Sequence, residues 1–192
     1  HLNWSTSLAA VDLVIPISNH VADQYAEFTR ASASRLSQDV RVCWLGAEIE
    51  PDKSSIVNDT ISSFAVRPPI NFCLAVGSLN PRRGYKQLIE DFEKIWEADG
   101  ETSLVIVGSP DELSRELEIR ILSHPELCRR LFWYHDLLDV QVRYLFQNSI
   151  ALIAASYDEG FCLPVVEARG LGVPVIARDI NVLREIHGDA LI

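Results

Sequence analysis

The sequence of 192 residues contains no methionine, and no part of it approaches the roughly 20 consecutive apolar residues that a membrane-spanning helix needs. Its longest apolar runs are short and have the length of buried strands. The first residues show no basic segment followed by an apolar one, so no secretory signal is expected. Because position 1 is histidine, we expect that it is not the native start of the protein.

Positive charge is also scarce: 17 basic side chains stand against 27 acidic ones, which gives a net charge of −10 and a pI near 4.9. This balance argues against a nucleic-acid binder and against electrostatic adhesion to anionic lipid. Apolar residues make up 48%, and glycine and proline number only 9 each, as in a folded globular protein. The length fits one domain, or one domain and a fragment of a second.

Cysteine is present at four positions but never with the spacing of a metal site. Cys43, Cys73, Cys128 and Cys162 form no CxxC or CxxH pair, so a zinc site is not expected. A disulfide framework is typical of much shorter secreted chains. We therefore predict four reduced, mostly buried thiols in a cytosolic protein.

The hydrophobic pattern alternates between strands and helices joined by short loops. Strands are predicted at residues 11–18, 40–45, 72–76, 104–107, 130–134, 150–155 and 175–177, and helices at 20–29, 85–98, 112–122, 140–147 and 164–171. Residues 48–69 are polar, lack a period and end in prolines, which is typical of a linker. Because the strands are unbroken apolar runs, the pattern predicts an α/β fold with a doubly wound parallel sheet. Ligands of such folds bind at the carboxyl ends of the strands.

One candidate site follows the predicted strand at 150–155 and opens a helix. Gly160 is expected to allow a sharp turn, and Pro164 is placed where the first helical residue should be. Free backbone amides at such a helix start form a ready anion site. We expect these amides at Phe161, Cys162 and Leu163.

Two carboxylates flank that helix start, Glu159 in the loop and Glu167, expected in the first helical turn, eight residues later. Carboxylates accept hydrogen bonds from vicinal hydroxyls, such as those of a ribose or a hexose. Amides for phosphates and acids for hydroxyls together describe a nucleotide-sugar pocket. An equally weighted alternative is that both acids only favour a helix N-terminus and face solvent. A glycosidase-like acid pair explains their context less well.

A second candidate site lies after the predicted strand at 72–76. Arg82, Arg83 and Lys86 place three cations within five residues, and could provide the positive charge that a diphosphate needs. The alternative is a solvated loop beside a helix start. The segment is neither a GxxxxGK[ST] loop nor a GxGxxG turn, because Gly77 and Gly84 are seven residues apart.

The stretches VGSLNPRRGYKQLIEDF, LVIVG, LFWYHDLLD and EGFCLPVVEARGLGVPVIARD resemble the donor-binding domain of retaining glycosyltransferases with the GT-B fold. More specifically, they resemble family 4, the group 1 transferases. The resemblance is good over residues 72–190 and looser over 11–47. It implies a remnant of an N-terminal acceptor-side domain plus linker at residues 1–66. A Rossmann-like donor-binding domain, truncated at its C-terminus, would follow at residues 67–192.

The resemblance also implies roles for individual residues. Glu167 would bind the nucleotide ribose, while Glu159 would contact hydroxyls of the donor sugar. The implied helpers of Glu159 are the amides of Gly160, Phe161 and Cys162, and Leu163 with the helix start would face the diphosphate. Glu159 and Arg83 are the implied catalytic residues.

In the second segment, Arg83 stands where the family usually has a lysine that reaches the diphosphate. Ser78, next to Gly77, replaces a frequent arginine, and Arg82 is its candidate substitute. The base would lie against the loop after Tyr134, where this sequence has His135-Asp136 in place of the family's usual glycine, so the base is left open. Asp139 is predicted to N-cap the following helix.

By this resemblance the protein would transfer a hexose from a nucleoside-diphosphate sugar, with GDP-mannose as the named candidate, in polysaccharide or lipopolysaccharide biosynthesis. It would need no cofactor and no metal.

A glycan or lipid-linked acceptor would bind through the absent N-terminal domain, with no nucleic-acid partner. We expect a cytoplasmic protein, with membrane contact or peripheral attachment at the inner face of the cytoplasmic membrane considered only for the full-length protein. The 192 residues alone are expected to be inactive in transfer. The alternative is a non-catalytic nucleotide-binding module; a sugar-nucleotide epimerase would need further acid–base residues.

Overall fold

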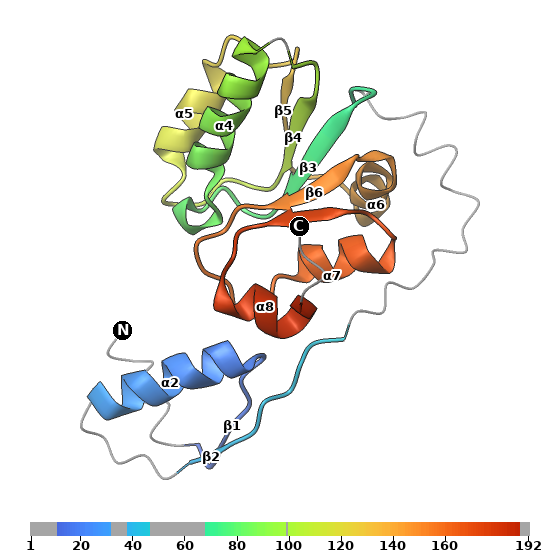
Figure 1. Cartoon of the computed structure of the whole chain (residues 1–192). Helices are drawn as coiled ribbons and strands as arrows, with labels where there is room; N and C mark the ends of the chain where they lie inside the picture. Colours follow the sequence, from blue (N-terminus) through green and yellow to red (C-terminus); the bar gives the residue numbers. More distant parts are fainter. Residues whose placement is uncertain (1–10, 32–37, 47–67, 99, 189–192) are drawn as a thin grey trace. The chain divides into compact units, whose positions relative to one another are not determined.

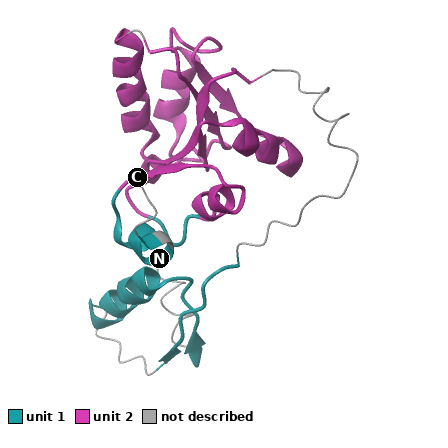
Figure 2. Ribbon diagram, turned by 45° about the vertical axis from the view of Figure 1, so that its right-hand side comes forward, with its two compact units in different colours: residues 1–46, 159–162, 179–190 teal, residues 47–158, 163–178, 191–192 magenta. Residues whose placement is uncertain are grey.

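The computed structural model describes residues 11–31, 38–46, 68–98 and 100–188. The chain divides into two compact units (Figure 2). Unit 1 consists of His1–Gly46, Glu159–Cys162 and Asp179–Ala190, and unit 2 of Ala47–Asp158, Leu163–Arg178 and Leu191–Ile192. The predicted domain boundary between residues 66 and 67, and nearly all of the predicted linker, lie outside the described residues.

Unit 2 contains a five-stranded sheet in the order β5-β4-β3-β6-β7, in which every neighbouring pair is parallel. Its strands are β3 (Phe72–Val76), β4 (Ser103–Val107), β5 (Leu131–Tyr134), β6 (Ala151–Ala154) and β7 (Val175–Ala177). Strands β3 and β4 are almost completely buried, which explains why they are continuous apolar runs. The predicted fold class is confirmed.

Helices cover both faces of this sheet (Figure 1). On one face lie α4 (Tyr85–Glu97) and α5 (Arg115–Leu122), and on the other α6 (Asp139–Asn148) and α7 (Leu163–Gly170). Alternate strand residues serve the two faces. Cys73, Ala75 and Ile106 belong to the core formed with α4 and α5. Their neighbours Leu74 and Val105 are fully buried and point to the other face.

Unit 1 is built from short elements: β1 (Leu13–Val14), β2 (Asp39–Val40), α2 (Asn19–Ala31) and α8 (Asn181–His187). β1 and β2 pair in parallel, and the backbone bonds Arg41 N to Val14 O and Cys43 N to Pro16 O continue this pairing. No side chain of α2 is fully buried. The start of α2 is held by hydrogen bonds from the His20 N–H to Glu185 and from the Val21 N–H to Ser18.

The predicted elements differ from the observed ones mainly at their ends. Strands β3 and β7 have the predicted bounds. The helix predicted from residue 112 begins at Arg115, because the Asp111 carboxylate accepts the Leu113 N–H at 2.8 Å and holds a turn there. The strands predicted at 11–18 and 40–45 shrink to two residues each, and α8 was not predicted.

The prediction of mostly buried thiols is wrong for half of the cysteines: Cys73 and Cys162 are buried, whereas Cys43 and Cys128 are exposed. Cys43 follows a strand that is shorter than predicted, and Cys128 lies in the turn before β5. Within the part of the chain that the structure describes, no helix is both long and apolar enough to cross a bilayer.

Candidate functional site

The sheet order reverses between β3 and β6. From β3 the chain moves outward through β4 to β5, and then returns to β6 and moves outward to β7 on the other side. Strands β3 and β6 are therefore neighbours whose connections lead to helices on opposite faces of the sheet, which is the switch point where ligands bind in open α/β sheets. Both sequence-predicted site segments begin at this point.

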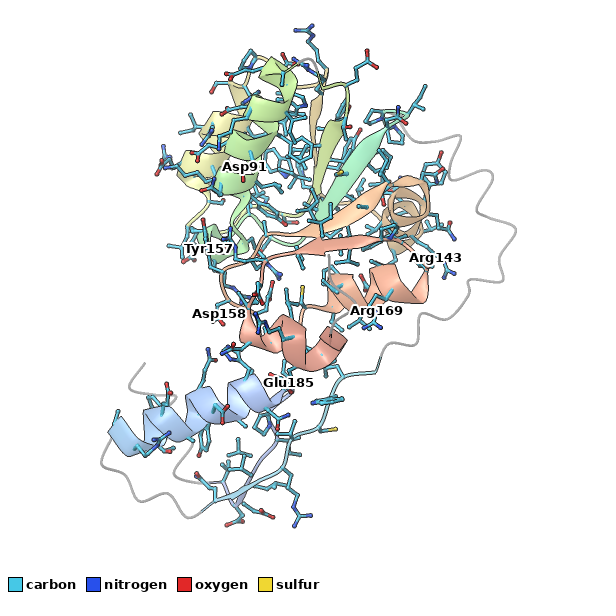
Figure 3. The ribbon with its side chains drawn as sticks, in the orientation of Figure 1. Asp91, Arg143, Tyr157, Asp158, Arg169 and Glu185 are labelled. Atoms are coloured by element: carbon cyan, nitrogen blue, oxygen red, sulfur yellow. The ribbon has the colours of Figure 1, made fainter. Side chains whose placement is uncertain are left out.

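The loops after β3 and β6 are joined by direct contacts within unit 2. The Tyr157 N–H donates to Arg82 O at 2.8 Å, and Arg82 Nη1 donates to the Asp158 carbonyl at 3.4 Å. Figure 3 shows Tyr157 and Asp158 where the chain leaves β6. Gly84, with φ of +72°, approaches so closely that a Cβ there would lie 2.3 Å from Ala155 O. The loops after β3 and β6 therefore lie together at the carboxyl edge of the sheet.

Side chains outside the predicted site shape the loop after β3. The Tyr85 hydroxyl donates to Gly77 O at 2.9 Å, and Asn80 Nδ2 donates to an Asp111 carboxylate oxygen at 2.9 Å. Asn80 Oδ1 accepts the Arg82 N–H at 3.1 Å and so caps the short 3-10 helix Pro81–Arg83. Tyr85, predicted only to begin a helix, thus holds the backbone of the site.

Gly108, at the end of β4, was not predicted as part of the site. A Cβ on Gly108 would lie 1.9 Å from Gly77 O, so the loop after β4 touches the loop after β3 through bare backbone. The Gly77 N–H donates to Val107 O at 2.8 Å. A glycine directly after a buried strand is the signal that could have identified this position.

The two arginines and the lysine of the cationic segment separate. The Arg83 guanidinium lies against Gly77, with Cζ and Nε both 3.0 Å from where a Cβ of that glycine would be. Arg82 is exposed beside Asp158. Lys86 turns to helix α5, where its Nζ lies 3.6 Å from a Glu116 carboxylate oxygen. The structure thus brings two of the three cations to the site, with the exposed Ser78 next to Gly77.

Glu167 lies on α7 in unit 2 and is partly buried. It is the fifth residue of a helix that begins at Leu163, so the prediction that it lies in the first turn is wrong. Burial, and then the nearby negative charge of Asp139, raises the pKa of the Glu167 carboxyl. A carboxylate that is poorly solvated here would regain hydrogen bonds from hydroxyl groups of a ligand.

The helix starts around this site differ from the predictions. Leu138, not Asp139, is the N-cap of α6, and its N–H donates to Gln141 Oε1 at 2.9 Å. Asp139 is the first helical residue. Pro164 is the second residue of α7, because Leu163, which is exposed, begins the helix.

The segment Glu159–Cys162 belongs to unit 1. Glu159 is only 5% exposed, and Phe161 and Cys162 are buried as well. The residue with a left-handed φ in this turn is Cys162, at +65°, whereas Gly160, which was expected to allow a sharp turn, has no positive φ. Because Glu159 and Glu167 fall in different units, each carboxylate is placed only within its own unit.

The predicted base loop follows β5. Tyr134 hydroxyl is buried and has no hydrogen-bond partner among the described residues, and burial raises the pKa of Tyr134 to about 12. His135 Nδ1 lies 2.8 Å from an Asp136 carboxylate oxygen, and Asp136 adopts a left-handed φ of +58°. Both side chains are largely exposed. In the described ranges, no group of three or more His, Cys, Asp or Glu is placed to hold a metal ion.

Residues 60–191, well over half of the chain, match the protein family described as glycosyl transferases group 1. The chain belongs to the group 1 glycosyltransferases. This group 1 chain is 31% identical over 196 residues to the serotype-specific mannosyltransferase WbdA of Escherichia coli. The aligned region covers 95% of this chain and 23% of WbdA. It is 26% identical over 141 residues to the O-antigen chain mannosyltransferase RfbU of Salmonella typhimurium. This alignment covers 72% of the chain and 39% of RfbU. The chain therefore spans less than half the length of these relatives.

Solved structures share the fold at low identity. The pneumococcal O-GlcNAc transferase GtfA, in complex with UDP and GlcNAc, has a TM-score of 0.61 at 20% identity, covering 89% of this chain and 31% of that one. The Candida albicans trehalose-6-phosphate phosphatase N-terminal domain has a TM-score of 0.72 at 14% identity, covering 94% and 47%. Together with the family match, these likenesses confirm the GT-B type of fold for the group 1 chain.

Proposed function

We propose that this chain binds a nucleoside-diphosphate sugar, with GDP-mannose as the donor, for retaining hexosyl transfer in polysaccharide or lipopolysaccharide biosynthesis. The observation that carries the proposal is the junction of the loops after β3 and β6. There Arg82 is bonded to the loop after β6, and Arg83 lies on the Gly77 backbone. The mannosyltransferase names of the relatives support the choice of sugar.

Each proposed binding residue has the chemistry needed by the part of the nucleotide sugar that it contacts. The guanidinium groups of Arg83 and Arg82 bind the diphosphate, because guanidinium forms charge-assisted hydrogen bonds to phosphate oxygens. Glu167 accepts hydrogen bonds from the ribose hydroxyls. Glu159 binds hydroxyls of the sugar, helped by the amides of residues 160–162. Gly77 and Ser78 line the diphosphate side, and Leu163 begins the helix that faces it.

The reaction breaks the bond between the anomeric carbon and the diphosphate oxygen, whose electron pair leaves with the nucleoside diphosphate. The acceptor hydroxyl oxygen forms the new bond on the same face and gives its proton to the departing diphosphate. Arg83 and Arg82 stabilise the charge that develops on the departing phosphate. The proposal assigns this task to the arginines and to the α7 helix start, and therefore includes no metal and no cofactor.

Other parts of the protein complete the proposed activity. A glycan or lipid-linked acceptor binds outside these 192 residues, so this chain alone binds donor without transferring sugar. We place the reaction in the cytoplasm, with any contact to the inner face of the membrane made by the full-length protein.

A thermal-shift series tests the proposal. GDP, UDP, ADP and GDP-mannose are added separately to the chain and to a Glu167→Ala variant, with Glu97→Ala on the exposed end of α4 as the matched control. A ligand that binds the folded state raises the melting temperature. We expect the shift with GDP and GDP-mannose in the wild type and the control, and a smaller one in Glu167→Ala. No shift, or equal shifts in all three proteins, contradicts the assigned pocket, and equal shifts would favour a non-catalytic module.

A further inference from the structure

We propose that Ser18 is a positioning residue for the donor sugar: its hydroxyl fixes the peptide group between Gly160 and Phe161 beside Glu159. This inference rests on the proposed function, because it concerns the loop assigned to the sugar. Ser18 was not a candidate in the sequence, where it ends a predicted strand 142 residues before Gly160. Both residues belong to unit 1.

The hydroxyl of Ser18 makes two hydrogen bonds in a fully buried position. It donates to the Gly160 carbonyl at 2.7 Å and accepts the Val21 N–H at 3.1 Å. Ser18 itself is 0% exposed. The bond from Val21 satisfies a free amide at the start of α2, so this donation leaves the hydroxyl proton for Gly160. One side chain thus joins the helix start to the loop that carries Glu159.

Apolar contacts hold the same loop residue. A Cβ on Gly160 would lie 3.2 Å from Ile17 Cδ1 and 3.7 Å from Val21 Cγ2. The backbone of Gly160 therefore packs directly on side chains that flank Ser18. Glycine at this position is explained by close approach and not by a left-handed turn, because the left-handed residue is Cys162.

Helix α2 is itself anchored, which makes it a firm support. The carboxylate of Glu185, on α8 (Figure 3), accepts the Asn19 N–H at 2.7 Å, the Asn19 Nδ2 group at 2.9 Å and the His20 N–H at 2.9 Å. Although burial acts to raise it, the pKa of the Glu185 carboxyl is lowered by these N–H donors. The amides next to Ser18 are thereby satisfied by a fixed acceptor.

The consequence for the donor follows from the planar peptide group. The Gly160 carbonyl and the Phe161 N–H lie in one rigid plane and point in opposite directions, so fixing the carbonyl also fixes the direction of the N–H. That N–H is one of the amides assigned to the sugar, and Glu159 directly precedes Gly160. Loss of the Ser18 hydroxyl would let the peptide group rotate without removing any group assigned to the nucleotide.

The test compares the affinities of GDP and GDP-mannose for the 192-residue chain by titration calorimetry. In Ser18→Ala we expect the affinity for GDP-mannose to fall roughly three- to tenfold, the effect of one hydrogen bond, with GDP affinity unchanged. Ser18→Thr, which keeps the hydroxyl, should restore most of the difference. Ser114→Ala is the matched control, because Ser114 is also a 0% exposed hydroxyl at a helix start but lies in unit 2.

The outcomes separate this inference from the proposed function. If wild-type chain binds neither ligand, the proposed function fails. If GDP binds and Ser18→Ala weakens both ligands equally, or neither, the positioning role is overturned. If Ser18 had only a structural role, Ser18→Ala and Ser114→Ala would lose equal amounts of ligand affinity. The ratio of the GDP-mannose affinity to the GDP affinity would then stay unchanged in both variants.

Discussion

Glu167 shows how an environment sets the behaviour of one side chain. It is partly buried, and burial followed by the charge of Asp139 raises the pKa of its carboxyl. Between the pKa of the unfolded chain and this raised value, the folded state holds more protons, so the contribution of Glu167 to stability falls as pH rises. The ionised form is the one that accepts hydrogen bonds from ribose hydroxyls.

This predicts that nucleotide affinity decreases on acidification at a pH above that of an ordinary glutamate. Asp139→Asn removes the nearby charge, so we expect the midpoint of the affinity curve to move to lower pH. Titrating GDP at a series of pH values from roughly 4 to 7 measures both midpoints. Asp136→Asn, an exposed aspartate on the preceding loop, is the control. An unchanged midpoint in Asp139→Asn would argue against this coupling.

At the residue scale, the sequence predicted that Arg82 and Arg83 follow β3, but not which groups hold them. The contact of Arg83 with Gly77 lies within the loop after β3, whereas the contacts of Arg82 with Tyr157 and Asp158 join segments far apart in the sequence. The Tyr85 hydroxyl on Gly77 O and the Ser18 hydroxyl on Gly160 O depend on distances in space. Nothing in the spacing of a tyrosine or serine along the chain indicates which carbonyl it will reach.

At the scale of elements, Gly84 decides how the loop after β3 joins α4. It shares a φ of +72° with Gly172, but a Cβ at Gly84 would lie 2.3 Å from Ala155 O, whereas one at Gly172 meets nothing within 4 Å. Comparing substitutions at Gly84 and Gly172 therefore distinguishes the cost of a left-handed backbone from the cost of a steric clash. The overlap is with backbone, which cannot rotate away as a flexible side chain would.

We predict that Gly172→Ala lowers the free energy of unfolding by about 1 kcal/mol, the cost of a left-handed alanine. Gly84→Ala should lower it by about 3 kcal/mol or more, because the β3 and β6 loops must also move apart. Urea denaturation of both variants measures the difference. Equal losses would mean that the close approach of Gly84 to Ala155 contributes nothing.

The hydrophobic pattern of the sequence predicted the types of most helices and strands, but it did not predict where several of them begin or end. Continuous apolar runs identified the buried strands of unit 2, because burial on both faces leaves little choice of residue. The end of a helix depends on single side chains, such as Asp111, which delays α5, and Gln141, which accepts the Leu138 N–H at the start of α6. Helix α8 escaped prediction because its seven residues are too short to show a clear period.

At the scale of the whole molecule, the strand order could not be predicted from the sequence. Each apolar run is compatible with several neighbours, and only the structure shows β3 between β4 and β6. That order places the two site loops together. The division into units also depends on contacts between distant segments, such as those that bring Glu159–Cys162 and residues 16–22 into unit 1.

Unit 1 should depend on the cap that Glu185 provides for α2. Glu185→Gln replaces one acceptor oxygen by an amide donor that faces another N–H, so we expect a loss of about 1 kcal/mol in local stability. Hydrogen exchange should become faster in residues 19–31 and stay unchanged in β3 and β4. Uniform acceleration throughout the chain, or none in α2, would contradict the role given to this cap.

In the proposed function, the junction of the β3 and β6 loops binds the diphosphate of a nucleotide sugar. The most direct test is a calorimetric titration of GDP-mannose into the wild-type chain, Arg83→Ala and Lys86→Ala. Lys86 is the matched control, a cation three residues away whose ion pair is with Glu116. We expect a roughly ten- to hundredfold loss of affinity in Arg83→Ala and little change in Lys86→Ala. Equal affinities for Arg83→Ala and the wild type, or no binding by the wild type, would contradict it.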